Sequence, residues 1–233
     1  MPSKRYKKAL ALLEAGKAYS LKAAVETLAK FPKAKFNESV EIAFRLGIDP
    51  RQSDQMVRGT VPLPHGSGKA VRVLVFARSG QAADAALAAG AEFVGFEDMI
   101  KKCVEGWTDF DVAIATPDAM IEVRKLGKVL GPRGLMPNPK TGTVTEDTAK
   151  AVKEVKAGRV EYKTDKAGNV HVLIGKASFS QIQLEENART VLNTVFKSRP
   201  PSVKGIFVLS CTLSATMSPG LRLDTKEFLS SAA

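Results

Sequence analysis

Hydrophobic and polar positions alternate in different ways in three successive stretches of the chain. In the first stretch, apolar residues recur at helical spacing at Tyr6, Leu10 and Leu13 and again at Leu21, Val25 and Leu28. A strand with one buried face is predicted where apolar residues occupy every second position, at Val40, Ile42, Phe44, Leu46 and Ile48. Residues 1–66 are therefore predicted to be α+β.

The second stretch begins after residues 62–69, where Pro, Gly and Ser interrupt both periodicities and predict a flexible linker. Short apolar strands are expected at 71–76, 93–94 and 112–115, and helices at 81–89, at 97–104 and from Pro117 onward. Strands that alternate with helices are typical of a parallel sheet covered on both faces. Residues 67–158 are therefore predicted to form a Rossmann-like, three-layer α/β/α domain.

The third stretch returns to an α+β pattern at Arg159. Residues 159–162 and 170–174 flank a turn at 165–169 and predict a hairpin. A long helix, a strand at 205–211 and a frayed tail from Ser230 should follow, and the apolar stripe of the helix is Leu184, Ala188, Val191, Leu192 and Val195. Because the opening stretch has too few strands to form a sheet alone, we expect residues 1–66 and 159–233 to form one discontinuous α+β domain, into which 67–158 are inserted.

Charge is distributed unevenly between these two predicted domains. The net charge of +11 and the pI near 9.7 indicate a polyanionic partner, although an acidic membrane surface would also suit them. The discontinuous domain has 22 Lys and Arg against 12 Asp and Glu, a net charge of +10, whereas the inserted domain has 13 against 12, a net charge of +1. We therefore expect the discontinuous domain to hold the polyanion site.

The remaining composition favours a cytoplasmic protein without a metal or cofactor. No stretch approaches the roughly 20 apolar residues that a membrane helix needs. Cys103 and Cys211 are far apart in the sequence and indicate neither a disulfide framework nor a zinc site. His65 and His171 are isolated, which favours packed or exposed histidines over catalytic or metal-binding ones.

The main alternative is a nucleotide-dependent enzyme built on the middle domain. In Gly66-Ser-Gly-Lys-Ala70, a P-loop would require Gly at Leu63 and Ser or Thr at Ala70. The segment also precedes its strand, whereas a phosphate cradle follows one, so that a helix N-terminus points at the anion. An enzyme is therefore disfavoured.

A second Gly-rich segment, Leu126-Gly-Lys-Val-Leu-Gly-Pro-Arg-Gly-Leu-Met-Pro-Asn-Pro-Lys140, is basic and rich in proline. The prolines fix backbone angles, and the glycines at 127, 131 and 134 are expected to allow turns. Secondary RNA contacts through phosphates are possible at Lys128, Arg133 and Lys140. A well-packed surface loop without a ligand explains the segment equally well.

This segment and four others, in order, resemble the bacterial ribosomal protein L-one family over nearly the whole chain: Leu46-Gly-Ile-Asp-Pro-Arg51, Val57-Arg-Gly-Thr-Val-Pro-Leu-Pro-His-Gly66, Gly175-Lys-Ala-Ser-Phe179 and Thr216-Met217. The resemblance implies a split α+β domain with an inserted Rossmann-like one, and no enzymatic activity. It implies binding to large-subunit ribosomal RNA at the mobile stalk, near the exit site, where the family assists release of deacylated tRNA. It also implies repression of translation through binding to the protein's own operon messenger RNA.

The same resemblance places the main RNA contacts in the discontinuous domain, at Lys35, Phe36, Asn37, Ser39, Glu41, Thr216, Met217 and Ser218. Lys35 suits a phosphate, and Phe36 can lie flat against a base or ribose, although strand alternation would also place it in the core with Val40. Hydroxyl and amide groups suit 2′-hydroxyls, and Glu41 can accept from an amino group or a 2′-hydroxyl.

Ser218 departs from the family pattern, which usually reads Thr-Met-Gly-Pro. This chain reads Thr216-Met-Ser-Pro-Gly220. Ser218 is expected either to obstruct a close approach of RNA or to replace a water with its hydroxyl, and Gly220 to restore the turn one step later.

Overall fold

The computed structural model describes residues 3–14, 16–52, 54–78 and 80–229. The chain forms two compact units, Met1–Gly68 with Val160–Ala233, and Lys69–Arg159. Both boundaries lie within two residues of the expected ones, at 66/67 and 158/159. Among the charged residues only Arg159 changes side, so the excess positive charge still lies in the discontinuous unit.

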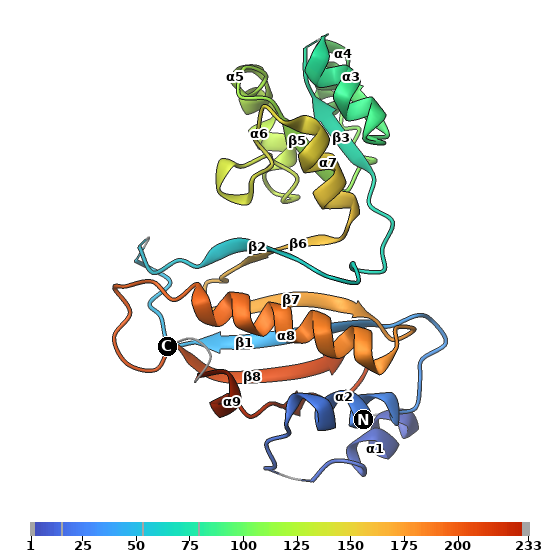
Figure 1. The fold of residues 1–233 in the computed structure, drawn as a ribbon, viewed down its shortest axis with the longest axis vertical. Helices are drawn as coiled ribbons and strands as arrows, with labels where there is room; N and C mark the ends of the chain where they lie inside the picture. Colours follow the sequence, from blue (N-terminus) through green and yellow to red (C-terminus); the bar gives the residue numbers. More distant parts are fainter. Residues whose placement is uncertain (1–2, 15, 53, 79, 230–233) are drawn as a thin grey trace. The chain divides into compact units, whose positions relative to one another are not determined.

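A four-stranded sheet forms the centre of the discontinuous unit, in the order β7 (Asn169–Lys176), β1 (Ser39–Leu46), β8 (Val208–Ala215) and β9 (Leu221–Arg222). β1 pairs antiparallel with β7 on one side and with β8 on the other, so that Ile42 lies between Val172 and Leu213. The opening segment thus obtains both neighbours of its strand from the closing segment (Figure 1).

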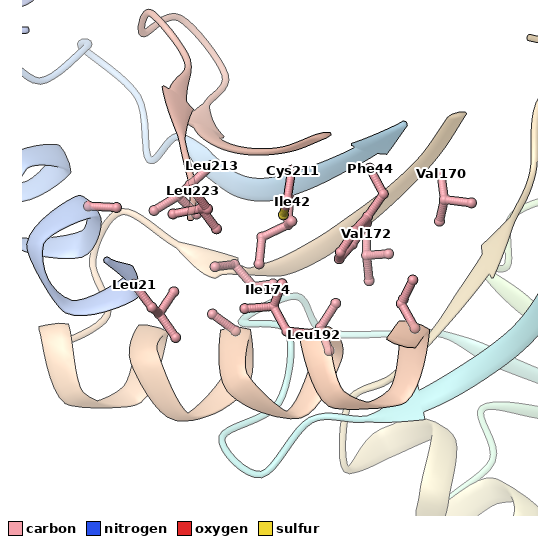
Figure 2. Packing of buried hydrophobic residues seen from close by; sticks show 14 of the residues in the cluster. Leu21, Ile42, Phe44, Val170, Val172, Ile174, Leu192, Cys211, Leu213 and Leu223 are labelled. Atoms are coloured by element: carbon pink, nitrogen blue, oxygen red, sulfur yellow. The ribbon is translucent and has the colours of Figure 1, made fainter. Parts of the chain in front are cut away.

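The core of this unit lies between the sheet and the helices α8 (Gln181–Lys197) and α2 (Leu21–Ala29). Ile42 and Phe44 of β1 project toward Leu192 of α8, and Leu21 of α2 closes one end of the cluster (Figure 2). Burying a side chain of this size stabilises a fold by about 1.5–3 kcal/mol. Ser180 and Gln183 form a capping box that begins α8.

Residues 41, 43 and 45 of β1 lie on the face of the sheet opposite the core. Glu41 and Ala43 are half-buried and Arg45 is exposed, because successive strand residues point to opposite faces. Two short helices complete the unit, α1 (Lys4–Leu10), which Ser3 caps, and α9 (Lys226–Leu229).

Three expectations for this unit were wrong in detail. The turn at 165–169 forms, with the Asp165 N–H donating to the Asn169 carbonyl, and an antiparallel bridge joins Thr164 to Val170, but the expected hairpin extends no further. β6 (Arg159–Lys163) pairs with β2 (Arg58–Pro62), and β7 pairs with β1, because each finds its partner in a distant segment. β8 also begins three residues later than expected, at Val208, and ends at Ala215. The expected tail from Ser230 lies outside the described residues.

The third expectation that was wrong concerns residues 62–69, which were expected to be a flexible linker. This segment packs against α8 instead. Leu63 and Ser67 are buried, and Asn187 of α8, which is fully buried, donates to the Gly66 carbonyl at 3.1 Å. The Asn187 side-chain oxygen accepts the His65 N–H at 3.1 Å. A buried polar side chain therefore fixes the point at which the chain leaves this unit.

The second unit is a mixed α/β structure with a three-stranded parallel sheet in the order β4 (Phe93–Gly95), β3 (Val73–Phe76) and β5 (Val112–Ala115). Every residue of β3 is buried, as expected for a central strand covered on both faces. Val73 and Val75 pack with residues of α3 (Gln81–Ala88) and α7 (Thr148–Lys156). Leu74 and Phe76 pack with residues of α4 (Glu97–Val104), α5 (Met120–Val123), η1 (Arg124–Leu126) and α6 (Gly127–Leu130).

Sequence reasoning missed α7 and misplaced one helix start. Asp147 caps α7 through the Lys150 N–H, and the helix buries Ala151, Val152 and Val155. The helix expected from Pro117 begins at Met120, because residues 117–119 form a turn. None of the described helices is long and apolar enough to cross a membrane.

Candidate nucleic-acid interface

The start of β1 and the turn after β8 meet at one corner of the antiparallel sheet. Val40 lies opposite Ala215, so the next residues outward, Ser39 and Thr216, face each other. The Ser39 N–H donates to the Thr216 Oγ1 at 3.0 Å, and the Thr216 N–H donates to the Ser39 carbonyl at 3.0 Å. The fold therefore brings together the two segments, 35–41 and 216–218, from which RNA contacts were expected.

Both segments present apolar and basic side chains to solvent. Phe36 is 55% exposed and Met217 is 54% exposed, and Lys35, Asn37 and Thr216 are exposed as well. Phe36 precedes β1, so strand alternation does not direct its side chain into the core. Of its two expected placements, the structure selects the exposed one.

The end of β7 and the turn after it add two residues that were not among the expected contacts. Lys176 lies opposite Ser39 across the sheet, and its Nζ donates to the Ser39 Oγ at 2.7 Å. The Asn37 side-chain amide donates to the Ser178 Oγ at 3.1 Å. Both lie in the segment 175–179 that carries part of the family resemblance, which is the signal that could have identified them. We call the exposed or half-exposed set at this corner the corner surface: Lys35, Phe36, Asn37, Ser39, Lys176, Ser178, Thr216 and Met217.

Two expected contact residues lie at the edges of the corner surface. Glu41 is half-buried on the face of the sheet opposite the core, between Leu173 and Ser214. The Ser218 Oγ accepts the Ala215 N–H at 2.9 Å and lies 3.3 Å from the Ala215 carbonyl oxygen. The hydroxyl of Ser218 is thus used inside the turn, whereas both expectations for it assumed an outward side chain.

Gly220 lies next to β8. A Cβ on Gly220 would lie 2.6 Å from the Thr212 Cγ2, closer than such atoms pack. A side chain at position 220 would therefore have to displace the Thr212 side chain.

Beneath the corner surface lies a buried carboxylate, Glu38. Its Oε1 accepts from Arg5 of α1 at 3.3 Å, and its Oε2 accepts the Ala34 N–H at 3.3 Å. The Glu38 carbonyl accepts the Ala177 N–H at 2.8 Å. Arg5 also donates to the Met217 carbonyl at 3.3 Å, so one ion pair contacts both halves of the corner.

The three secondary candidates, Lys128, Arg133 and Lys140, are exposed in the second unit. Arg133 donates to the Thr108 hydroxyl, and Lys140 lies in the 3-10 helix η2 (Pro139–Thr141). Gly134 has the positive φ, +71°, that other residues rarely adopt, and Gly131 lies in the same turn, 131–134, but with a helical φ of −59°. The turn expectation is wrong at Gly127, which begins the helix α6 with a φ of −54°. At Gly131 a Cβ would collide with the Gly127 carbonyl oxygen, which explains why that residue is small.

The two cysteines are buried, whereas the two histidines are exposed. Cys103 and Cys211 are buried and free, and burial raises the pKa of both thiols, which keeps them protonated. His65 pairs with Glu186, and His171 is exposed on β7. Within the described residues, no group of three or more His, Cys, Asp or Glu is arranged to hold a metal ion.

A family model matches residues 28–219, and its description is the Ribosomal protein L1p/L10e family. The match spans most of the chain, includes the whole second unit and contains every residue of the corner surface. It confirms the resemblance noted in the sequence at the level of the family, which groups L1p with L10e.

Proposed function

Because this chain belongs to the Ribosomal protein L1p/L10e family, we propose that it binds large-subunit ribosomal RNA at the mobile stalk, near the exit site for deacylated tRNA. Membership makes it an RNA-binding ribosomal protein, and the family is not one of enzymes. The alternative of a nucleotide-dependent enzyme is therefore set aside.

The meeting of Ser39 and Thr216 at one corner is the observation that carries the choice of site. It gathers the chemical groups that recognise folded RNA. Lys35 and Lys176 can neutralise phosphates, and the exposed Phe36 and Met217 offer apolar surface to a base or ribose. Asn37 and the hydroxyls at the corner suit 2′-hydroxyls, which distinguish RNA from DNA. Glu41, at the edge of this surface, can accept from an amino group.

Crosslinking tests this proposal directly. The protein is purified at moderate salt, its copurifying RNA is sequenced, and the complex is irradiated to map crosslinked peptides. We expect large-subunit ribosomal RNA, with crosslinks in peptides that contain 35–41 and 216–218. Crosslinks confined to residues 69–159 would place the main RNA site in the other unit.

The proposal extends to two further RNA partners, deacylated tRNA at the exit site and the protein's own operon messenger. The family resemblance supports both. A messenger that folds like the ribosomal site would occupy the same corner surface, so the two RNAs should compete for the protein. Ribosomes that lack the protein should release deacylated tRNA more slowly than ribosomes to which it is restored. Simultaneous binding of ribosomal RNA and messenger would argue against a shared site.

A further inference from the structure

We infer that Arg5 and Glu38 are positioning residues, an ion pair that holds the two halves of the corner surface in one geometry for RNA. This inference rests on the proposed function. It assigns a role to two residues that carry no expected RNA contact themselves. We refer to them as the Arg5–Glu38 clamp.

Glu38 anchors the first half of the corner. Its side chain is 7% exposed, and it lies between two expected contact residues, Asn37, which is exposed, and Ser39, which is half-buried. Residues 32–38 form neither helix nor strand, so no regular hydrogen-bond ladder orders them. The Glu38 carboxylate bonds the Ala34 N–H, which bridges the turn that presents Lys35 and Phe36. The Glu38 carbonyl ties the same turn to the end of β7 through Ala177.

Arg5 connects Glu38 to the second half of the corner surface, the turn after β8. Its guanidinium reaches the Glu38 carboxylate with Nη1 and the Met217 carbonyl with Nη2, both at 3.3 Å. Arginine suits this position because its planar fork holds two acceptors at a fixed separation, whereas a lysine ammonium is a single point of charge. The clamp therefore joins α1, the turn before β1 and the turn after β8.

Such a clamp raises RNA affinity by preorganisation. A surface that is already ordered loses less conformational entropy when RNA binds. Loss of the clamp should weaken binding without removing a phosphate contact. The salt slope therefore distinguishes a positioning role of Arg5 from a direct phosphate contact, because each phosphate contact contributes about 0.7–0.9 to the slope of log affinity against log salt.

The test uses full-length large-subunit ribosomal RNA transcribed in vitro and filter binding at several salt concentrations. The variants are Arg5→Met, Glu38→Gln and the double variant, each in the full chain. Lys8→Met is the matched control, because Lys8 is exposed on the same helix and its loss removes the same charge. We expect each single variant to weaken binding about tenfold with an unchanged salt slope. The double variant should be no weaker than either single variant, because all three break one clamp.

Thermal melts accompany each binding curve, since Arg5→Met leaves a buried carboxylate without its cation. If that variant does not fold, Glu38→Gln and the double variant still decide the matter, because neither leaves a buried charge. Variants that bind like the wild type would overturn the clamp, and a reduced salt slope in Arg5→Met alone would make Arg5 a phosphate ligand instead. Failure of the wild-type protein to bind this RNA would overturn the proposed function, and the clamp with it.

Discussion

The Thr216 side chain completes the hydrogen bonding of a strand from the other end of the sequence. The Thr216 Oγ1 accepts the Ser39 N–H at 3.0 Å, and the backbone N–H of Thr216 donates to the Ser39 carbonyl. The pairing of β1 with β8 is thereby continued by one residue beyond Val40 and Ala215. These hydrogen bonds therefore join the two halves of the corner surface before any ligand binds.

Replacement of Thr216 by Val tests this pair with little change of volume. The Ser39 N–H loses its acceptor, and an RNA group that Thr216 contacts loses its partner. We expect RNA affinity to fall by roughly 1–2 kcal/mol. Thr190→Val on α8, where the hydroxyl bonds the Glu186 carbonyl, is the matched control and should leave affinity unchanged. If filter binding does not distinguish Thr216→Val from the wild type, the corner is not the RNA site.

Replacement of Ser218 by Gly restores the residue that the family usually has at this position. The Ala215 N–H loses its acceptor, so we expect the free energy of unfolding to fall by about 1 kcal/mol and RNA binding not to tighten. Denaturant melts measure the first effect. Ser218→Ala serves as the control, because it removes the same bond without adding backbone freedom. Tighter binding by Ser218→Gly would show that the side chain crowds the RNA.

The salt dependence of binding reports how many phosphates the protein neutralises. The discontinuous unit carries most of the net charge of +11, although its cations cannot all face one RNA. We expect a slope of log affinity against log salt equivalent to about four or more phosphates. A flat response would exclude recognition that depends mainly on phosphates.

Excision of the second unit tests which unit holds the main site. Residues 69–159 are removed, and Gly68 is joined to Val160 by a short Gly/Ser linker. The flanking strands β2 and β6 belong to one two-stranded sheet, so a short linker can join the ends. We expect a product that is folded by circular dichroism and binds RNA within about tenfold, or 1.4 kcal/mol, of the intact protein. RNA binding by residues 69–159 alone, and not by the excised product, would reverse the assignment.

Asp111 should make the second unit sensitive to acid. Hydrogen bonds from the Lys69 side chain and from Arg72 lower the pKa of Asp111 from 3.8 to about 2. A pKa that is lower in the folded state adds stability above the unfolded value, and this stability is lost as pH falls from about 4 to about 2. We expect Asp111→Asn to lower the melting temperature at neutral pH. The difference in melting temperature between the variant and the wild type should shrink as pH falls from about 4 to about 2. A difference that stays constant over this pH range would indicate lost packing instead.

The hydrophobic pattern predicted those elements whose burial is decided locally. The alternation from Val40 to Leu46 matches β1, and the stripe from Leu184 to Val195 lies on α8. The apolar strands of the middle stretch and the helix at 97–104 also lie where they were expected. α7 was missed although Ala151, Val152 and Val155 recur at helical spacing and Asp147 precedes them as an N-cap.

By itself, the sequence determined which residues face a core and which short segments resemble a ribosomal protein family, because periodicity and motif order are written along the chain. Only the tertiary structure decided that β6 pairs with β2, that Phe36 is exposed, and that Lys176 joins Ser39 and Thr216 at one corner. It also turned the Ser218 hydroxyl inward and placed Arg5 between the Glu38 carboxylate and the Met217 carbonyl. The physical reason is that a periodic pattern specifies the buried face of an element but not its partner. Partners 137 and 177 residues away are chosen by packing and hydrogen bonding in the assembled sheet.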